Sequence, residues 1–338
     1  MENKETTPVF SVIVPVYNRN EEVADLLKSL SAQTRRDFEV ILVEDGSTLP
    51  CTEAVDKFGQ GLDLHYYHKS NEGRSIARNY GIERSRGKWL IFFDSDCVIP
   101  HTYFEILGEY LEHNKLDCFG GPDAAHESFT PVQKAINFAM TSFLTTGGIR
   151  GGKMSMEKFT PRSFNMGYTR EVYDTVGGFR EMFSEDIDMS MRVRNAGFSS
   201  GLVREAAVYH KRRVDFRKFL RQVYVFGMSR ITLKLLYPGS LKLVHTLPAI
   251  AVALGALCCL LAVILSPWWL LPIGIYLLAI LFAAFASTHS PKIAFLAVPA
   301  SIIQIGGYGC GFLNAWFNKI LLRKGRDIDS EIEIRRGK

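Results

Sequence analysis

Acidic residues and arginine are missing from one long part of this 338-residue chain. Between residues 241 and 322 there is no Asp, Glu or Arg, and the only Lys residues there are Lys242, Lys292 and Lys319. Helices in a lipid bilayer avoid charge in this way, whereas water-soluble domains do not. We therefore expect a soluble N-terminal part of about 240 residues, followed by lipid-embedded helices over about 80 residues.

Two further absences bear on the cellular compartment. The six cysteines form no CxxC pair and lie scattered or in apolar segments, so we expect reduced, structural thiols. Residues 1–8 are polar and a strand is expected directly after them, which does not fit a secretory signal peptide. The N-terminal domain is therefore expected to stay in the cytosol.

Common nucleotide-binding motifs are absent as well, and an alternation of strands and helices is present instead. No GxGxxG, GxxxxGKS or GxxxxGKT sequence occurs, which argues against a dinucleotide fold and a P-loop. Strands are predicted at residues 10–16, 38–43, 62–67, 89–93, 116–121, 164–169 and 206–209, and helices at 21–33, 52–58, 73–85 and 170–176. This order predicts an α/β fold with a mainly parallel sheet and helices on both faces.

Two carboxylates, Asp94 and Asp96, directly follow the apolar run 89–93. Ligands of open α/β sheets bind beyond the carboxyl ends of the strands, which is where both residues fall, together with Tyr17 and Asp45. Hard oxygen ligands of this kind suit Mg²⁺ or Mn²⁺, which substrate phosphates and water usually complete. The alternative interpretation is an ordinary Asp-Ser-Asp turn.

The neighbouring residues favour a nucleotide as the ligand. The ring of Tyr17 can stack on a base, and the carboxylate of Asp45 can accept hydrogen bonds from a base edge. Arg74 and Arg78 can meet phosphate oxygens, and the helix N-terminus beside Gly73 adds donors for an anion. Each residue also has a structural alternative, with Tyr17 in the core, Asp45 in a plain turn and the arginines on a solvated face.

Four motifs in this order resemble the successive motifs of the family-2 glycosyltransferases, which have the GT-A fold. They are SVIVPVYNR at 11–19, VEDGS at 43–47, NEGRSIARN at 71–79 and FDSD at 93–96. The resemblance covers roughly residues 9 to 210. Glu44 departs from it, because the family more often has a second Asp at that position.

The resemblance implies a role for each matched residue. Tyr17 resembles the base-stacking position, and Asp45 resembles the carboxylate that reads the base. Asp94 resembles the ribose contact and Asp96 the metal ligand, with Mn²⁺ or Mg²⁺ as the cofactor. The nucleotide-sugar site predicted in this way comprises Pro15, Tyr17, Asp45, Arg74, Arg78, Asp94 and Ser95.

A second pattern of acidic residues, Glu185-Asp186-x-Asp188, follows the sequence GGF at 177–179. Inverting glycosyl transfer needs one general base to deprotonate the acceptor hydroxyl. The pattern resembles the family's acceptor-side motif, so Asp186 is the predicted base, and Glu185 is expected to help place it or the acceptor. Asp188 is expected to cap the helix or to pair with Arg192. The structural alternative is an acidic first helix turn capped by Ser184.

Two features keep alternatives open. His210 follows the last predicted strand, where a histidine in this fold can complete the metal site, although a lone histidine is more often structural. The glycine-rich stretch 147–152 around Arg150 suits either a mobile lid over the acceptor or diphosphate, or a tolerated surface insertion.

The C-terminal part predicts membrane attachment. Residues 213–238 are expected to form an amphipathic interface helix, because a basic start precedes an aromatic face; a helix packed on the domain is the alternative. Residues 241–265 and 268–286 are long enough to span a bilayer, and 293–322 is either one broken span or a re-entrant hairpin. If all three segments span the membrane, the basic tail 323–338 lies on the side opposite the cytosol. This conflicts with the positive-inside rule, by which basic segments stay in the cytosol.

The expected domains are a cytosolic GT-A domain at 1–212, the interface helix, two to three transmembrane helices at 239–322 and the charged tail. The expected activity is inverting, metal-dependent transfer of a sugar from a nucleotide-diphosphate donor to a hydroxyl of a lipid-linked glycan. This would serve cell-surface polysaccharide synthesis at the inner membrane, without a nucleic-acid partner. A polyprenyl-phosphate sugar synthase and a non-catalytic binding subunit are the alternatives. A processive synthase is disfavoured because a Gln-x-x-Arg-Trp motif is absent.

Overall fold

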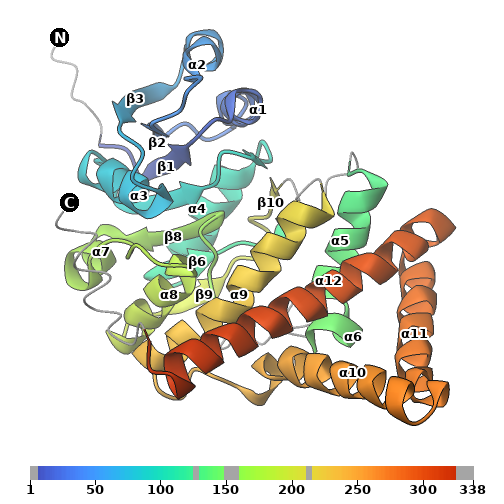
Figure 1. The fold of residues 1–338 in the computed structure, drawn as a ribbon. Coiled ribbons are helices and arrows are strands. Elements are labelled where there is room, and N and C mark those ends of the chain that lie inside the picture. The colour runs from blue at the N-terminus through green and yellow to red at the C-terminus, as the bar shows by residue number, and fades with distance from the viewer. Residues whose placement is uncertain (1–6, 125–128, 148–159, 211–214, 325–338) are drawn as a thin grey trace, which may run out of the picture. The chain divides into compact units, whose positions relative to one another are not determined.

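The chain forms two compact units. The computed structural model describes residues 7–124, 129–147, 160–210 and 215–324. The first unit comprises residues 1–126 and 154–211, and the second comprises residues 127–153 and 212–338. Within the described residues, the first unit contains the β-sheets and the second is helical (Figure 1).

A seven-stranded sheet in the order β3-β2-β1-β4-β8-β6-β9 forms the centre of the first unit. Its strands are β1 (Phe10–Val16), β2 (Phe38–Asp45), β3 (Asp63–Lys69), β4 (Trp89–Phe93), β6 (Cys118–Gly120), β8 (Asn165–Thr169) and β9 (Ser200–Leu202). Strand β8 runs antiparallel to β4 and β6, and the other neighbouring pairs are parallel. The predicted α/β fold with a mainly parallel sheet is therefore confirmed.

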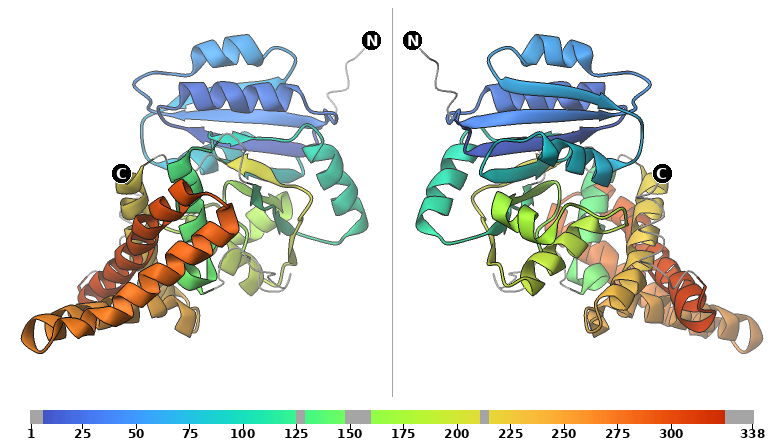
Figure 2. Two further views of the ribbon diagram at one scale, coloured as in Figure 1. Left: turned by 90° about the vertical axis from the view of Figure 1, so that its right-hand side faces the viewer. Right: turned by 90° about the vertical axis from the view of Figure 1, so that its left-hand side faces the viewer.

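Helices cover both faces of this sheet. Helices α1 (Asn20–Ser31), α2 (Thr52–Phe58) and α4 (Tyr103–His113) share one apolar core with it, and α3 (Arg74–Glu83), α7 (Arg170–Val176) and α8 (Glu185–Asn195) share another. Successive side chains of a strand point to opposite faces, so Val12 of β1 lies in the first core and Ile13 in the second. Figure 2 shows α1 and α2 together over one face.

A second sheet of three short strands follows the order β5-β10-β7. The strands are β5 (Cys97–Val98), β7 (Asp123–Ala124) and β10 (Val208–His210). Strand β10 pairs antiparallel with β5, and the register places the backbone of His210 opposite Cys97. The end of β10 therefore lies next to the residue that directly follows Asp96 in the chain.

The second unit is built around one long helix. Its elements are α5 (Pro131–Thr141), α6 (Phe143–Thr146), α9 (Phe216–Leu236), η2 (Leu243–His245), α10 (Leu247–Ile264), η3 (Pro267–Leu270), α11 (Leu271–Thr288), α12 (Pro291–Ala315) and η4 (Trp316–Leu321). Helix α12 packs against α5, α9, α10 and α11, and their buried apolar side chains form the core of this unit.

Glycines allow α12 and α9 to pack closely. A Cβ built on Gly311 would lie 2.0 Å from the carbonyl oxygen of Tyr224, and one on Gly227 would lie 2.0 Å from that of Tyr308. No side chain fits at either position, which is the close backbone approach typical of helices that pack through small residues. Gly309 faces α10 in the same way.

Three helical segments are long and apolar enough to cross a membrane, namely Leu247–Ile264, Pro267–Thr288 and Pro291–Leu321. Only 6% and 11% of the first two are buried, against 39% of the third. Residues 291–315 run as one continuous helix through Pro299, although proline removes one backbone donor. The re-entrant hairpin considered for this stretch is therefore wrong.

Candidate active site

The carboxyl ends of three parallel strands bring the predicted motifs together. We call the side of the sheet formed by these strand ends its carboxyl edge. Tyr17 follows β1, Asp45 ends β2, and Asp94 follows β4. The side chain of Tyr17 is 51% exposed, so its ring is accessible to a base. Pro15 is partly buried in β1, and Ser95 is buried in the turn between Asp94 and β5.

The carboxylate of Asp45 anchors the loop that leads into α3. Its Oδ1 accepts hydrogen bonds from the Glu72 backbone nitrogen at 3.0 Å and from Lys69 Nζ at 2.9 Å. Its Oδ2 accepts from the Gly73 backbone nitrogen at 2.9 Å. Because both oxygens already have donors, Asp45 holds this loop at the edge of the sheet, a role that the sequence pattern did not predict.

A buried ion-pair network centred on Arg78 joins three motifs. Arg78 is fully buried; its Nη2 lies 2.7 Å from Asp94 Oδ1 and its Nη1 lies 3.0 Å from Glu185 Oε1. Arg74, one helical turn earlier, places Nη2 at 2.7 Å from Glu185 Oε2. The end of β4, the face of α3 and the start of α8 therefore converge, although residues 74 and 185 lie far apart in the chain.

The two arginines differ in what they can do at this edge. Both were predicted to meet phosphate oxygens. Arg78 is enclosed between two carboxylates, which suits a role in positioning Asp94 and Glu185. The side chain of Arg74 is 56% exposed, so it can turn towards a ligand. Of the two arginines, Arg74 is therefore the one that a ligand can reach.

The GGF motif is held against α3 by an asparagine. Asn79 donates from Nδ2 to the carbonyl oxygen of Phe179 at 2.8 Å, and its Oδ1 accepts from the Phe179 backbone nitrogen at 2.8 Å. A Cβ on Gly178 would lie 2.4 Å from Asn79 Oδ1, so any other residue there would displace the Asn79 amide from these hydrogen bonds. Ser184, the N-cap residue of α8, has φ +65°, a left-handed conformation that is strained for a residue with a Cβ.

Asp186 lies at the start of α8 beside basic residues. Its Oδ2 is 3.3 Å from Arg162 Nη1, and its Oδ1 accepts from the Ile187 backbone nitrogen at 2.8 Å. Burial alone would raise the pKa of the Asp186 carboxyl, but the charges of Arg162 and Arg74 outweigh it and hold the pKa below its ordinary value. The carboxylate is therefore ionised at neutral pH.

Two arginines near the site were missed by the sequence analysis. Arg162 follows a weakly patterned segment and belongs to no motif. Arg19 is the last residue of the motif SVIVPVYNR at 11–19, and this position was the signal that could have found it. Burial lowers the pKa of Arg19, but its hydrogen bond to Glu22 and the charges of Asp96 and Asp94 raise it above the ordinary value.

The remaining predicted residues lie near the turn after β4, in helix α8, or outside the residues that the structure describes. Asp96 is partly buried between β4 and β5. The backbone of His210 lies beside β5, but its side chain is outside what the structure describes. Arg150 and most of the glycine-rich stretch also fall outside the described residues. Asp188 pairs with Arg192 Nε at 2.9 Å, as predicted.

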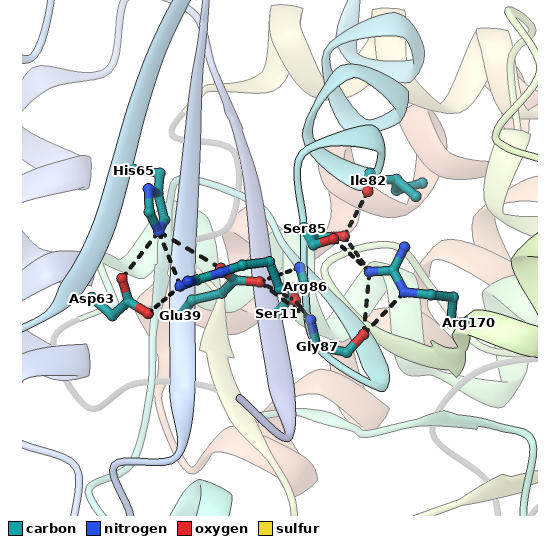
Figure 3. A network of polar contacts seen from close by, with 9 residues as sticks. All are labelled: Ser11, Glu39, Asp63, His65, Ile82, Ser85, Arg86, Gly87 and Arg170. Carbon is teal, nitrogen blue, oxygen red and sulfur yellow. Dashed lines mark hydrogen bonds and ion pairs between the residues drawn. The ribbon is translucent and has the colours of Figure 1, made fainter. Parts of the chain in front are cut away.

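A second acidic cluster lies at the opposite edge of the sheet, where the strands begin (Figure 3). Glu39, Asp63 and His65 place potential ligand atoms within 4.8 Å of one another, close enough to hold a metal ion. Arg86 already bridges them, with Nε 2.9 Å from Glu39 Oε2 and Nη2 2.6 Å from Asp63 Oδ2. The cation that these carboxylates face is therefore an arginine, and the cluster ties β2 and β3 to the residues before β4.

Known proteins are similar in sequence to this chain. The family model described as "Glycosyl transferase family 2" matches residues 11–183. An uncharacterized glycosyltransferase of Rickettsia bellii is 40% identical over 104 residues, which are 31% of this chain and 15% of that protein. Glycosyltransferase AglE of Haloferax volcanii is 25% identical over 259 residues, covering 72% of this chain and 79% of AglE. The chain thus spans a small part of the Rickettsia relative but most of AglE.

Solved structures share the fold. The mannosyltransferase PcManGT from Pyrobaculum calidifontis, in complex with GDP-Man and Mn²⁺, has a TM-score of 0.56 at 18% identity, covering 95% of this chain and 89% of that one. S. aureus TarS 1-349, in complex with UDP-GlcNAc, has a TM-score of 0.50 at 18% identity, covering 93% and 92%. Identities this low show the fold alone, which is GT-A. Since the family model covers half of the chain, the protein belongs to glycosyl transferase family 2.

Proposed function

We propose that the protein is a membrane-anchored, inverting glycosyltransferase that uses a nucleotide-diphosphate sugar. The observation that carries this proposal is the Arg78 network, which joins Asp94 of the donor-side motif to Glu185 of the acceptor-side motif. A donor and an acceptor must meet at one place for transfer to occur. An ion-pair network that fixes both motifs at one edge supplies such a place.

The donor would bind along the carboxyl edge of the sheet. The exposed ring of Tyr17 suits stacking on the base, with Asp45 and its loop beside it. Asp94 would contact the ribose, and the exposed guanidinium of Arg74 suits the diphosphate. The titles of the two structural neighbours name GDP-Man and UDP-GlcNAc, both of which belong to this donor class.

A divalent metal fits the acidic turn after β4. The hard carboxylate oxygens at this turn suit Mg²⁺ or Mn²⁺, and we propose Asp96 as a ligand, with His210 as a second. The bound ion would neutralise charge on the leaving diphosphate. The cluster of Glu39, Asp63 and His65 is not proposed for this role, because it faces Arg86 and lies at the opposite edge.

Asp186 is the proposed general base. Its carboxylate would take the proton of an acceptor hydroxyl while that oxygen bonds to the anomeric carbon and the bond to the diphosphate oxygen breaks. Its depressed pKa, which Arg162 and Arg74 maintain against burial, keeps it ionised for this step. Glu185, held by both arginines of α3, would position the segment that carries Asp186.

The apolar helices favour an acceptor in the membrane. Three candidate spans make a lipid-linked glycan at the cytoplasmic face the natural acceptor, with the catalytic domain in the cytosol and the helices in the inner membrane. In this proposal residues 1–212 form the catalytic domain, 213–238 the interface helix, 239–322 the membrane part and 323–338 a charged tail.

The proposal is tested with the full chain in membranes and a panel of radiolabelled nucleotide sugars. We expect one donor to label a lipid-extractable product with the opposite anomeric configuration, and we expect Asp186→Asn and Asp96→Ala to abolish this labelling. Asp63→Asn, at the other edge of the sheet, serves as the matched control. Undiminished transfer by both site variants would contradict the assigned roles.

A further inference from the structure

A groove with a basic rim and an apolar wall lies inside the helical unit, between α9 and α12. Its volume is about 690 Å³. Arg217, Lys218 and Arg221 of α9 supply the rim, and Leu220, Gly306 and Cys310 belong to the apolar wall. Helix α12 is also one of the three segments apolar enough to cross a membrane. The groove therefore joins a cationic end to a surface suited to hydrocarbon.

The rim carries more positive than negative charge. Lys218 lies 3.5 Å from Asp215, the N-cap residue of α9. Among the residues that the structure describes, Arg217 and Arg221 form no ion pair with a carboxylate. They are four residues apart and so share one face of the helix, and the positive end of the α9 dipole lies beside them. This arrangement attracts an anion.

Gly306 in the groove is not explained by the packing of the helices. Gly307 and Gly311 face α9, and Gly309 faces α10, each at a distance that a Cβ would violate. A Cβ on Gly306 would meet nothing within 4 Å. Glycine inside a helix destabilises it relative to alanine. Gly306 therefore makes no helix contact that requires glycine, and a side chain at this position would extend into the groove.

We propose that this groove binds the phosphate head group of an anionic membrane lipid, with the hydrocarbon chain along α12. Guanidinium groups bind phosphate oxygens through paired, charge-assisted hydrogen bonds, and two arginines, Arg217 and Arg221, line this groove. A water-soluble phosphate would leave the apolar wall of the groove uncovered. The proposal uses the membrane attachment proposed above but does not depend on sugar transfer.

Cys310 provides a reporter inside the groove. It is exposed, whereas the three cysteines of the first unit are buried. In full-length protein carrying Cys258→Ser and Cys259→Ser, reconstituted in nanodiscs, we would measure the rate at which a water-soluble maleimide alkylates Cys310. We expect slower alkylation when phosphatidylglycerol or a polyprenyl phosphate is added to phosphatidylcholine. Equal rates in all these lipids would overturn the proposal.

The rim is tested by charge removal with a matched control. Arg217→Gln and Arg221→Gln are each expected to weaken the protection of Cys310 about fivefold, since each arginine contributes to binding of an anionic surface. Lys234→Gln removes the same charge from α9 outside the groove, and it is expected to leave the protection intact. An equal loss of Cys310 protection in all three variants would mean that the positive charges attract the membrane surface without a specific site. That result would overturn the proposal.

The wall is tested by filling the groove. Gly306→Leu places a side chain in open space, so the helices should still fold while the groove is blocked. Gly255→Leu of α10 is the matched control, because a Cβ there also meets nothing within 4 Å. We expect only Gly306→Leu to lose anionic lipid that co-purifies with the protein, counted by mass spectrometry.

A final arm separates lipid from free anion. Inorganic phosphate added to phosphatidylcholine nanodiscs is expected to give no protection of Cys310. Protection by inorganic phosphate as strong as that by the lipids would identify a soluble anion as the ligand and overturn the proposal. Because every readout is binding, a protein that transfers no sugar can still support the lipid site, and an active enzyme can still lack it.

Discussion

The two edges of the main sheet, where its parallel strands begin and where they end, carry similar residues. They differ in how their charged side chains are paired. At the edge where the strands begin, Glu39 accepts hydrogen bonds from Ser11 Oγ at 2.6 Å and from Arg86 Nε at 2.9 Å. At the edge where the strands end, Arg78 binds Asp94 and Glu185. Both edges therefore contain acidic residues around an arginine, and residue type alone does not separate them.

The difference lies in what remains accessible. The charges of the first edge pair with one another and tie strands together. At the second edge, Arg78 and Glu185 are both buried, while the ring of Tyr17 and the side chain of Arg74 remain exposed. Open α/β sheets bind ligands at the carboxyl ends of their strands. The comparison teaches that position on the sheet separates the two acidic groups better than the number of clustered carboxylates.

Asp186→Asn should give the largest effect. The amide cannot accept the acceptor's proton, so we expect transfer to fall by roughly 10²- to 10⁴-fold. Donor binding, followed by thermal shift, should stay within about twofold because the base is not expected to hold the donor. Asp63→Asn at the other edge should retain normal turnover. Comparable losses in the two variants would erase the distinction between the edges.

Arg78→Met should destabilise the first unit strongly. It would leave the buried carboxylate of Glu185 without this cation, and breaking a buried pair in this way costs about 3–5 kcal/mol. Arg86→Met is the matched change at the other edge and should cost less, because the Arg86 side chain is 39% exposed. Hydrogen exchange of β4 and β2 peptides in the micelle-solubilised chain measures both. A larger loss from Arg86→Met would reverse the comparison.

Arg162→Gln should move the pH profile of transfer. The guanidinium of Arg162 lowers the pKa of the Asp186 carboxyl, so removing it raises that pKa towards or above the ordinary value of 3.8. The base is active when ionised, and the acid limb of kcat/KM should therefore shift to higher pH. Arg36→Gln, on an exposed loop, is the control. An unchanged acid limb would show that Arg162 does not tune Asp186.

The same depressed pKa has a consequence for stability. The ionised Asp186 carboxylate is favoured in the fold, so its contribution is present above pH 3.8 and is lost as the pH falls through the folded-state value. Arg162→Gln should remove part of this acid-dependent stability, which unfolding in denaturant at several pH values would detect. A parallel loss at every pH would instead indicate a simple packing defect.

His65→Ala should have the smallest effect. Its ion pair with Asp63 is 3.0 Å long but partly exposed, so we expect a loss of less than about 1 kcal/mol. Transfer and its dependence on metal should not change. A variant that lost metal-dependent activity would place the metal at the edge where the strands begin.

Much of the fold follows from local sequence patterns. Strand β4 occupies Trp89–Phe93 as predicted, because five consecutive apolar residues fit a strand buried on both faces. Helix α2 also has its predicted bounds. The antiparallel direction of β8 was not predictable, since its pairing with β4 depends on residues more than 70 positions away in the chain. Nor does apolar periodicity reveal that α12 continues through Pro299.

The placement of the candidate site residues was predictable in outline, but their contacts were not. Motif order indicated which residues reach the carboxyl edge, and the geometry of parallel strands accounts for this. The burial of Arg78 depends on Asp94 and Glu185, of which the second lies 107 positions away. Arg162 belongs to no motif, so only folding reveals its position beside Asp186. Charged contacts between distant segments are the part that a single sequence leaves undetermined.

The most direct test of the account is Mn²⁺ binding by the full chain in detergent, measured by electron paramagnetic resonance with UDP or GDP present. We predict that Asp96→Ala weakens Mn²⁺ binding at least about tenfold, while His65→Ala leaves it unchanged. Loss of Mn²⁺ binding in His65→Ala, with normal binding in Asp96→Ala, would contradict the assignment of the active site to the carboxyl edge of the sheet.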